Sequence, residues 1–201
     1  MITVVLATAN PDKAREIVDA LGDQFEVLPR PSHVPEVEET GSTLEDNARL
    51  KAAALVEATG HPALADDTGL EVDALDGAPG VYSSRYSGEH ATYADNVAKL
   101  LSELAGVAPE RRTARFRTVV LVRFPNGREL VAEGAVTGTI ATAAAGDDGF
   151  GYDPVFIPQE GDGRAFAQMT LTEKNAISHR GRAVRAAAAL LRQAVSESRS
   201  R

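Results

Sequence analysis

Residues Ala63–Val72 read ALADDTGLEV, and this stretch decides the fold. A short apolar run leads into two adjacent carboxylates, Asp66 and Asp67, followed by a hydroxyl and a glycine. The run is too short for a helix, so it predicts a buried strand, although Asp, Thr and Gly also favour turns. Because side chains alternate across a strand, Asp66 and Asp67 are expected to point to opposite faces. One of them can then reach a cleft at the strand end, where a carboxylate commonly holds a divalent metal.

The composition restricts the class of protein. A chain of 201 residues with 43% hydrophobic content fits one large globular domain or two small lobes. The absence of cysteine excludes disulfides and thiolate metal sites. A net charge of −8 argues against a general nucleic-acid binder, which would carry a basic patch. The first residues lack a basic leader and no apolar run approaches the ~18 residues of a membrane span, so we expect a soluble cytoplasmic protein.

Strand and helix signals alternate along the chain. We expect further strands over residues 3–7, 70–73, 114–124, 129–140 and 155–157, with Asn126-Gly127 marking a hairpin turn. We expect helices over residues 11–21, from a capping box at 42–45 to about 59, from a cap at 92 to a stop at 106, in a turn after 170, and from 178 to about 195. The interleaving predicts one α/β domain covering residues 1–201, with residues 196–201 as a frayed tail.

The turn Thr8–Lys13, which reads TANPDK, opens the first helix. A strand–turn–helix start makes backbone N–H groups available to an anion, and Pro11 suits the first helical position. Lys13 adds a positive charge in the first turn, although an ordinary solvated lysine is the alternative interpretation. The Walker P-loop motif is absent from the whole sequence. Any phosphate would therefore be bound by a different kind of loop.

Eight short segments form a pattern that extends over nearly the whole chain. They are Thr8–Lys13, Glu38–Gly41, Asn47–Ala52, Ala65–Leu70, Gly77–Gly80, Ser84–Tyr86, Phe150–Pro154 and Ser178–Gly181. In this order they resemble the inosine/xanthosine triphosphate pyrophosphatases, also called HAM1-like proteins. Two departures are small, since Ala9 stands where the family often has glycine and Thr68 where it often has serine.

The resemblance implies an elongated α/β fold of two lobes. It implies a twisted mixed β-sheet flanked by helices, with a nucleotide cleft between the lobes. The implied activity is hydrolysis of ITP, dITP and XTP to the monophosphate and pyrophosphate, with Mg²⁺ as cofactor and a homodimer as the assembly. The implied role is to remove deaminated purines from the nucleotide pool.

The resemblance also assigns roles to individual residues. Asp67 becomes the catalytic carboxylate that activates a water and binds metal, and Glu39 becomes the second metal ligand. Two carboxylates with several retained waters make an ordinary Mg²⁺ site. The implied substrate-binding residues are Thr8, Ala9, Asn10, Pro11, Asp12, Lys13, Lys51, Thr68, Phe150, Gly151, Tyr152, Asp153, Lys174, His179 and Arg180.

Base recognition follows from the last members of this set. Phe150 offers a face on which a base can stack, and Lys174, His179 and Arg180 offer hydrogen-bond donors. Hypoxanthine and xanthine carry an oxygen acceptor at position 6, where adenine carries an amino group. A pocket of donors therefore predicts a preference for ITP or XTP over ATP. Guanine shares the 6-oxo group, so rejection of GTP must involve position 2.

Two alternatives remain open on sequence alone. A Maf-like nucleotide pyrophosphatase has a related fold, but its first turn typically carries a serine-rich, arginine-paired motif, which Thr8–Lys13 does not match. A non-catalytic nucleotide-binding module would lack the metal carboxylates, and both Glu39 and Asp67 are present. Magnesium-dependent release of pyrophosphate distinguishes an enzyme from such a module.

Overall fold

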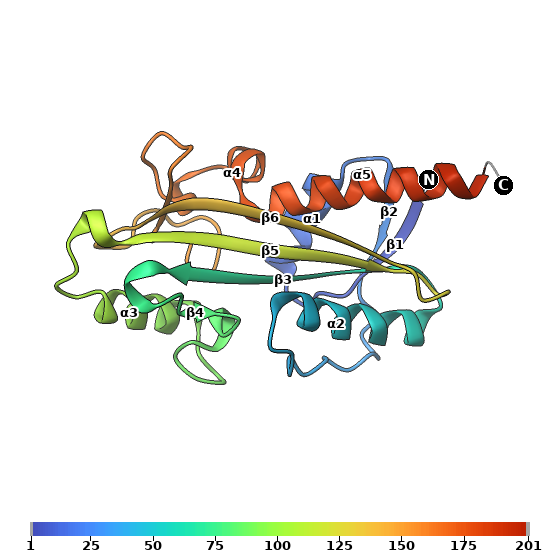
Figure 1. Cartoon of the computed structure of the whole chain (residues 1–201), viewed down its shortest axis with the longest axis horizontal. Helices are drawn as coiled ribbons and strands as arrows, with labels where there is room; N and C mark the ends of the chain where they lie inside the picture. Colours follow the sequence, from blue (N-terminus) through green and yellow to red (C-terminus); the bar gives the residue numbers. More distant parts are fainter. Residues whose placement is uncertain (1, 200–201) are drawn as a thin grey trace. The chain divides into compact units, whose positions relative to one another are not determined.

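The computed structural model describes residues 2–199 and contains a seven-stranded mixed sheet. The strand order is β2-β1-β3-β5-β6-β7, and β4 pairs with β3. The strands are β1 (Ile2–Leu6), β2 (Phe25–Leu28), β3 (Ala63–Val72), β4 (Pro79–Gly80), β5 (Thr113–Arg123), β6 (Glu129–Ile140) and β7 (Phe156–Pro158). The helices are α1 (Pro11–Leu21), α2 (Leu44–Thr59), α3 (Tyr93–Glu103), α4 (Leu171–Ile177) and α5 (His179–Arg199). The predicted α/β class, with a twisted mixed sheet flanked by helices, is confirmed (Figure 1).

The chain divides into two compact units, each made of separate segments. Unit 1 contains residues 2–67, 118–134 and 180–199, and unit 2 contains residues 68–117 and 135–179. Strands β3, β5 and β6 therefore contribute residues to both units.

Unit 1 is built around the parallel pairs of β1 with β2 and of β1 with β3. Helices α1 and α5 cover one face of its sheet, and α2 lies on the other face (Figure 1). The apolar face of α5 packs against α1 and the strands through small and branched side chains. The hydrophobic core of unit 1 includes Val4, Leu6, Ile17, Leu64, Val120, Ala183, Val184, Ala187 and Leu191. Burial of this continuous apolar surface holds the two helices on the sheet.

Unit 2 has a separate core rich in aromatic side chains. Leu100 and Leu104 of the α3 region pack there with Leu70 and Val72 of β3. The rings of Phe116, Phe156 and Phe166 lie in mutual contact, with centroids 4.7 to 6.3 Å apart. Each unit therefore has its own hydrophobic core.

Local sequence signals predicted most ends of helices and strands to within one or two residues of their positions in the structure. Thr92 caps α3 with a capping box to Asp95, and Thr170 caps α4 in the same way with Glu173. The hairpin between β5 and β6 turns at Gly127, which has φ of 84°. The cap of α2 is Thr43 rather than the expected Ser42, because the Thr43 hydroxyl accepts from the backbone N–H of Asp46.

Three boundaries differ from the expectations. Asp66 and Asp67 lie inside a ten-residue strand rather than at a strand end, because β3 continues to Val72 and pairs there with β4. Helix α3 ends at Glu103, before the expected stop at Gly106. Helix α5 continues to Arg199, so residues 196–199 are helical where a frayed tail was expected, and residues 200–201 lie outside the described residues. Within residues 2–199, every helix is too short or too polar to cross a bilayer.

Candidate active site

In the turn after β1, side chains accept hydrogen bonds from backbone N–H groups of the same turn. The Asn10 carboxamide accepts from the backbone N–H groups of Asp12, at 2.9 Å, and Lys13, at 3.2 Å. The Thr8 hydroxyl accepts from the Asn10 N–H at 3.1 Å. Pro11 occupies the first helical turn as predicted. Backbone N–H groups of this turn were expected to be available to an anion. Those of Asp12 and Lys13 donate to Asn10 in this structure, because an N-cap side chain satisfies the first donors of a helix.

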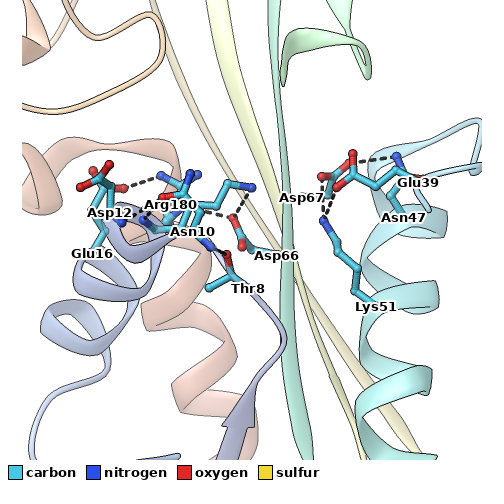
Figure 2. Close-up of polar contacts among 11 residues, drawn as sticks. Thr8, Asn10, Asp12, Glu16, Glu39, Asn47, Lys51, Asp66, Asp67 and Arg180 are labelled. Atoms are coloured by element: carbon cyan, nitrogen blue, oxygen red, sulfur yellow. Dashed lines mark hydrogen bonds and ion pairs between the residues drawn. The ribbon is translucent and has the colours of Figure 1, made fainter. Parts of the chain in front are cut away.

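The two carboxylates of β3 point to opposite faces of the strand, as predicted (Figure 2). Alternation along β3 directs Asp66 toward α1 and α5 and directs Asp67 toward α2. Each carboxylate therefore makes direct contacts with a different set of side chains.

On its face of β3, Asp66 belongs to a buried ion network. Its Oδ2 accepts from Arg180 Nε at 3.1 Å and lies 3.5 Å from Lys13 Nζ, while Arg180 Nη1 donates to Glu16. Asp66, Glu16 and Arg180 are only 2%, 3% and 2% exposed. Burial alone would raise the pKa of Asp66, but the charges of Lys13 and Arg180 outweigh it and hold that pKa well below its usual value. Asp66 is therefore a fixed negative charge beside Lys13.

This network gives Arg180 two partners that the sequence analysis did not identify. The resemblance implied that its guanidinium donates to the base, yet it is buried and directed to two carboxylates of its own unit. Glu16 carried no signal in the sequence, because a lone glutamate in an amphipathic helix is normally solvated.

On the opposite face, Asp67 is held from two directions. Its Oδ1 lies 2.9 Å from Lys51 Nζ, and its Oδ2 accepts from Asn47 Nδ2 at 3.1 Å. The same Lys51 ammonium lies 2.9 Å from Glu39 Oε1, so it joins the two carboxylates (Figure 2). Burial and the neighbouring Glu39 charge raise the pKa of Asp67 above its ordinary value, although Lys51 and Lys13 oppose the shift.

Asn47 is another residue that the sequence analysis left out of the site. It is fully buried, and its Oδ1 accepts from the backbone N–H of Gly41 at 2.8 Å while its Nδ2 donates to Asp67. A Cβ at Gly41 would lie 2.6 Å from that Oδ1, so only glycine lets this loop approach α2. Asn47 and Lys51 are four residues apart on one helical face, and this spacing was the available signal.

Glu39 and Asp67 carry the kind of ligand atoms that bind a divalent cation. Both are carboxylates, the hard oxygen ligands that Mg²⁺ prefers, and the Lys51 ammonium already bridges them as a cation. Within residues 2–199, no group of three or more acidic, histidine or cysteine side chains gathers as a metal cluster. Mg²⁺ held by only two carboxylates would keep several waters or take oxygens from a substrate.

In unit 2, an ion pair fixes the loop that carries Phe150. Asp153 accepts from the Phe150 backbone N–H at 2.8 Å and from the Lys174 ammonium. A Cβ at Gly149 would lie 2.2 Å from Asp153 Oδ2, and the φ of Gly149 is 74°, so this position requires glycine. Lys174 Nζ lies 4.9 Å from the centre of the Phe150 ring. Phe150 is thus positioned by both its backbone and a cation on its ring.

The other expected base-side residues are mostly buried. Tyr152 is buried and its hydroxyl donates to the Ser83 carbonyl at 2.9 Å, which gives it a structural partner. His179 is buried with its ring stacked on Phe116, at a centroid distance of 4.4 Å. Tyr93, which was not expected near the site, has its half-exposed ring 5.8 Å from Phe150.

The expected site residues therefore fall into two groups, one in each unit. The group in unit 1 comprises Thr8, Ala9, Asn10, Pro11, Asp12, Lys13, Glu39, Lys51, Asp67 and Arg180. The group in unit 2 comprises Thr68, Phe150, Gly151, Tyr152, Asp153, Lys174 and His179. The first group carries the charged side chains suited to phosphates and a cation, and the second carries the aromatic ring suited to a base.

Comparison with known proteins relates the whole arrangement to one family. A profile of the Ham1 family matches residues 4–190. The dITP/XTP pyrophosphatase of Nitratidesulfovibrio vulgaris is 54% identical over 192 residues, covering 91% of this chain and 92% of that protein. The dITP/XTP pyrophosphatase of Streptomyces coelicolor is 46% identical over 200 residues, covering 96% of this chain and 98% of that protein.

Solved structures give the same result for the fold. A HAM1 protein from Coxiella burnetii matches with a TM-score of 0.85 and 40% identity, covering 96% of this chain and all 100% of that one. A nucleoside-triphosphatase / dITP/XTP pyrophosphatase from Mycobacterium abscessus matches with a TM-score of 0.72 and 44% identity, covering 94% of this chain and 99% of the other. These similarities extend over nearly the full chain.

Proposed function

Because the chain belongs to the Ham1 family, we propose that it hydrolyses ITP, dITP and XTP to the monophosphate and pyrophosphate. This activity removes deaminated purines from the nucleotide pool. The observation that carries the proposal is the Glu39–Lys51–Asp67 cluster, which brings two carboxylates and an ammonium together on one face of β3. Relatives about half identical over more than nine-tenths of the chain are named dITP/XTP pyrophosphatases, which supports the same substrate class.

The phosphate chemistry is assigned to unit 1. Glu39 and Asp67 would hold Mg²⁺, which when bound supplies positive charge against the phosphate oxygens. Asp67 accepts a proton from the attacking water, whose oxygen bonds to the α-phosphorus as the bond to the bridging oxygen breaks. Lys13 and Lys51 bind the phosphate oxygens, and pyrophosphate leaves.

The base is assigned to unit 2, where Phe150 provides the stacking face. Lys174 and His179 are the donors on this side, and an ammonium has only donors. Such donors match the 6-oxo group of hypoxanthine or xanthine and leave the amino group of adenine unmatched. We assign Arg180 to the support of Asp66 and Lys13, because its guanidinium bonds to Asp66 and Glu16, and Asp66 in turn pairs with Lys13.

One assay tests the activity. The full chain is incubated with Mg²⁺ and ITP, XTP, GTP or ATP under the same conditions, and both products are identified. We expect the monophosphate with pyrophosphate, and a large preference for ITP or XTP over ATP. Equal rates on ITP and ATP would reject the pool-cleansing role, and a diphosphate with inorganic phosphate would reject cleavage between the α- and β-phosphates.

Assembly and location extend the proposal. The homodimer rests on the family resemblance, and light scattering on the purified chain measures its mass directly. A cytoplasmic location agrees with an activity on the free nucleotide pool. Cell fractionation with an antibody to the chain tests it.

A further inference from the structure

The ammonium of Lys51 occupies the place between the two carboxylates assigned to the metal. Its Nζ lies 2.9 Å from Glu39 Oε1 and 2.9 Å from Asp67 Oδ1 (Figure 2). The Lys51 and Asp67 side chains are only 12% and 7% exposed, so water screens these contacts weakly. One internal cation therefore already neutralises part of the charge that would attract a divalent ion.

A divalent cation needs the same oxygen atoms. Mg²⁺ binds carboxylate oxygens at about 2.0–2.1 Å and loses its waters reluctantly, so it gains little from oxygens that an ammonium already holds. Lysine has a flexible four-carbon stem and a point charge, so Lys51 can move to another anion without a change in α2. A triphosphate chain is such an anion.

We propose that Lys51 keeps Glu39 and Asp67 closed to a free divalent cation until a triphosphate takes its ammonium, so that the cation and the nucleotide bind cooperatively. This inference rests on the assignment of Glu39 and Asp67 as metal ligands in the proposed function. Thermodynamic linkage makes the effect reciprocal. The factor by which nucleotide raises the affinity for the cation equals the factor by which the cation raises the affinity for nucleotide. The free enzyme then holds little metal, and the cation enters with its substrate.

Replacement of Lys51 by methionine removes the ammonium and keeps an unbranched side chain of similar length. The two carboxylates then lack their internal cation, so a divalent ion no longer has to displace an ammonium from Glu39 and Asp67. We expect Lys51→Met to bind Mn²⁺ in the absence of nucleotide about tenfold more tightly than the wild type, within the usual range of coupling between sites. The further increase in Mn²⁺ affinity when nucleotide is added should be smaller in Lys51→Met than in the wild type, by a similar factor.

The experiment measures free Mn²⁺ by electron paramagnetic resonance, with the full chain alone and with an ITP analogue that has a methylene group between the α- and β-phosphates. The matched control is Arg49→Met, which removes a positive charge from the same helix. Arg49 pairs with Glu45 and Glu129 instead and its side chain is 37% exposed. Arg49→Met should reproduce the wild-type Mn²⁺ affinity in both conditions.

Two results would overturn the inference. In the first, Lys51→Met binds free Mn²⁺ no more tightly than the wild type, while the analogue still raises the Mn²⁺ affinity of both proteins. Lys51 then does not compete with the cation, and the assignment of Glu39 and Asp67 as metal ligands stands. If wild type binds no Mn²⁺ even with the analogue, the metal assignment itself fails, and the inference fails with it.

A second measurement needs no variant. The chain has four lysines, Lys13, Lys51, Lys99 and Lys174, so the side-chain nitrogen signals of ¹⁵N-lysine protein can be assigned. Adding Mg²⁺ alone should leave the Lys51 Nζ signal in place, and adding Mg²⁺ with the analogue should shift it. A full shift with Mg²⁺ alone would contradict the inference.

Discussion

Replacing Arg180 by methionine tests whether this arginine supports the fold of unit 1 or recognises the base. Its guanidinium is 2% exposed and joins Asp66 to Glu16, which are themselves buried. Removing one member of a buried ion network typically costs about 3–5 kcal/mol, because the remaining charges stay desolvated. Lys13, 3.5 Å from Asp66, compensates part of the loss, so we expect a cost near the lower end, about 3 kcal/mol.

For a domain of this size, a loss of about 3 kcal/mol lowers the melting temperature by roughly 6–12 °C. Calorimetry and urea unfolding of Arg180→Met measure the change, and Arg185→Met on the exposed side of the same helix is the control. The control should stay within about 0.5 kcal/mol of the wild type. Adding Glu16→Gln to Arg180→Met should restore part of the stability, because it removes one of the unpaired carboxylates.

The activity of the folded variant separates the two roles. If Arg180 supports Asp66 and Lys13, its loss should lower kcat/KM for ITP and ATP by a similar factor. A variant that unfolds like the wild type yet loses ITP activity selectively would refute this reasoning. Arg180 would then be a base-recognition residue, as the family resemblance implied.

Three further predictions concern other positions. Asp67→Asn should fold and lose nearly all pyrophosphate release, because an amide is a poor base and a poor Mg²⁺ ligand; near-normal turnover would contradict its role, and Asp66→Asn should instead mainly lose stability in urea unfolding. Lys13→Ala should lose a charged hydrogen bond of about 1.5–3 kcal/mol, or roughly ten- to a hundredfold in kcat/KM, and an unchanged value would make Lys13 a solvated residue. The Arg164 guanidinium and the cap of α4 lower the pKa of Glu173 from 4.5 to about 2, so its stabilising contribution is complete above pH 4.5 and is lost as the pH falls through about 2. In an NMR titration, Arg164→Gln should move that pKa back toward 4.5, and no movement would exclude the contact.

Local patterns predicted the elements that depend on local physics. The alternation of side chains placed Asp66 and Asp67 on opposite faces of β3, and Figure 2 shows this arrangement. The caps at Thr92 and Thr170 were recognisable because a hydroxyl followed three residues later by an acid satisfies the first N–H groups of a helix. The bounds of β6 were also predicted without error. The Asn-Gly turn is a local signal as well, and it fixes where this strand of the hairpin begins.

Pairing between distant residues was beyond local patterns. The extension of β3 past its carboxylates depends on its pairing with β4, where Leu70 lies opposite Gly80. Arg180 could be identified as a donor, but its partner Glu16 is 164 residues away along the chain, and no short-range rule selects it. Asn47 was missed for the related reason that its two partners, Gly41 and Asp67, become neighbours only in the folded unit.

The segmented build of unit 1 has a consequence for synthesis on the ribosome. Its first 67 residues leave the ribosome early, yet the side chains of α5 that cover Ile17 and Val4, and the guanidinium that neutralises Asp66, come from residues 180–199. At typical translation rates the interval of more than a hundred residues takes on the order of ten seconds. Unit 2 ends at residue 179, so it is translated before the residues of α5 that belong to unit 1. We therefore expect the apolar β1–α1 surface of the nascent chain to depend on chaperones until α5 emerges. We also expect truncation of α5 to damage the β1–α1 segment, which is made well before it, more than unit 2.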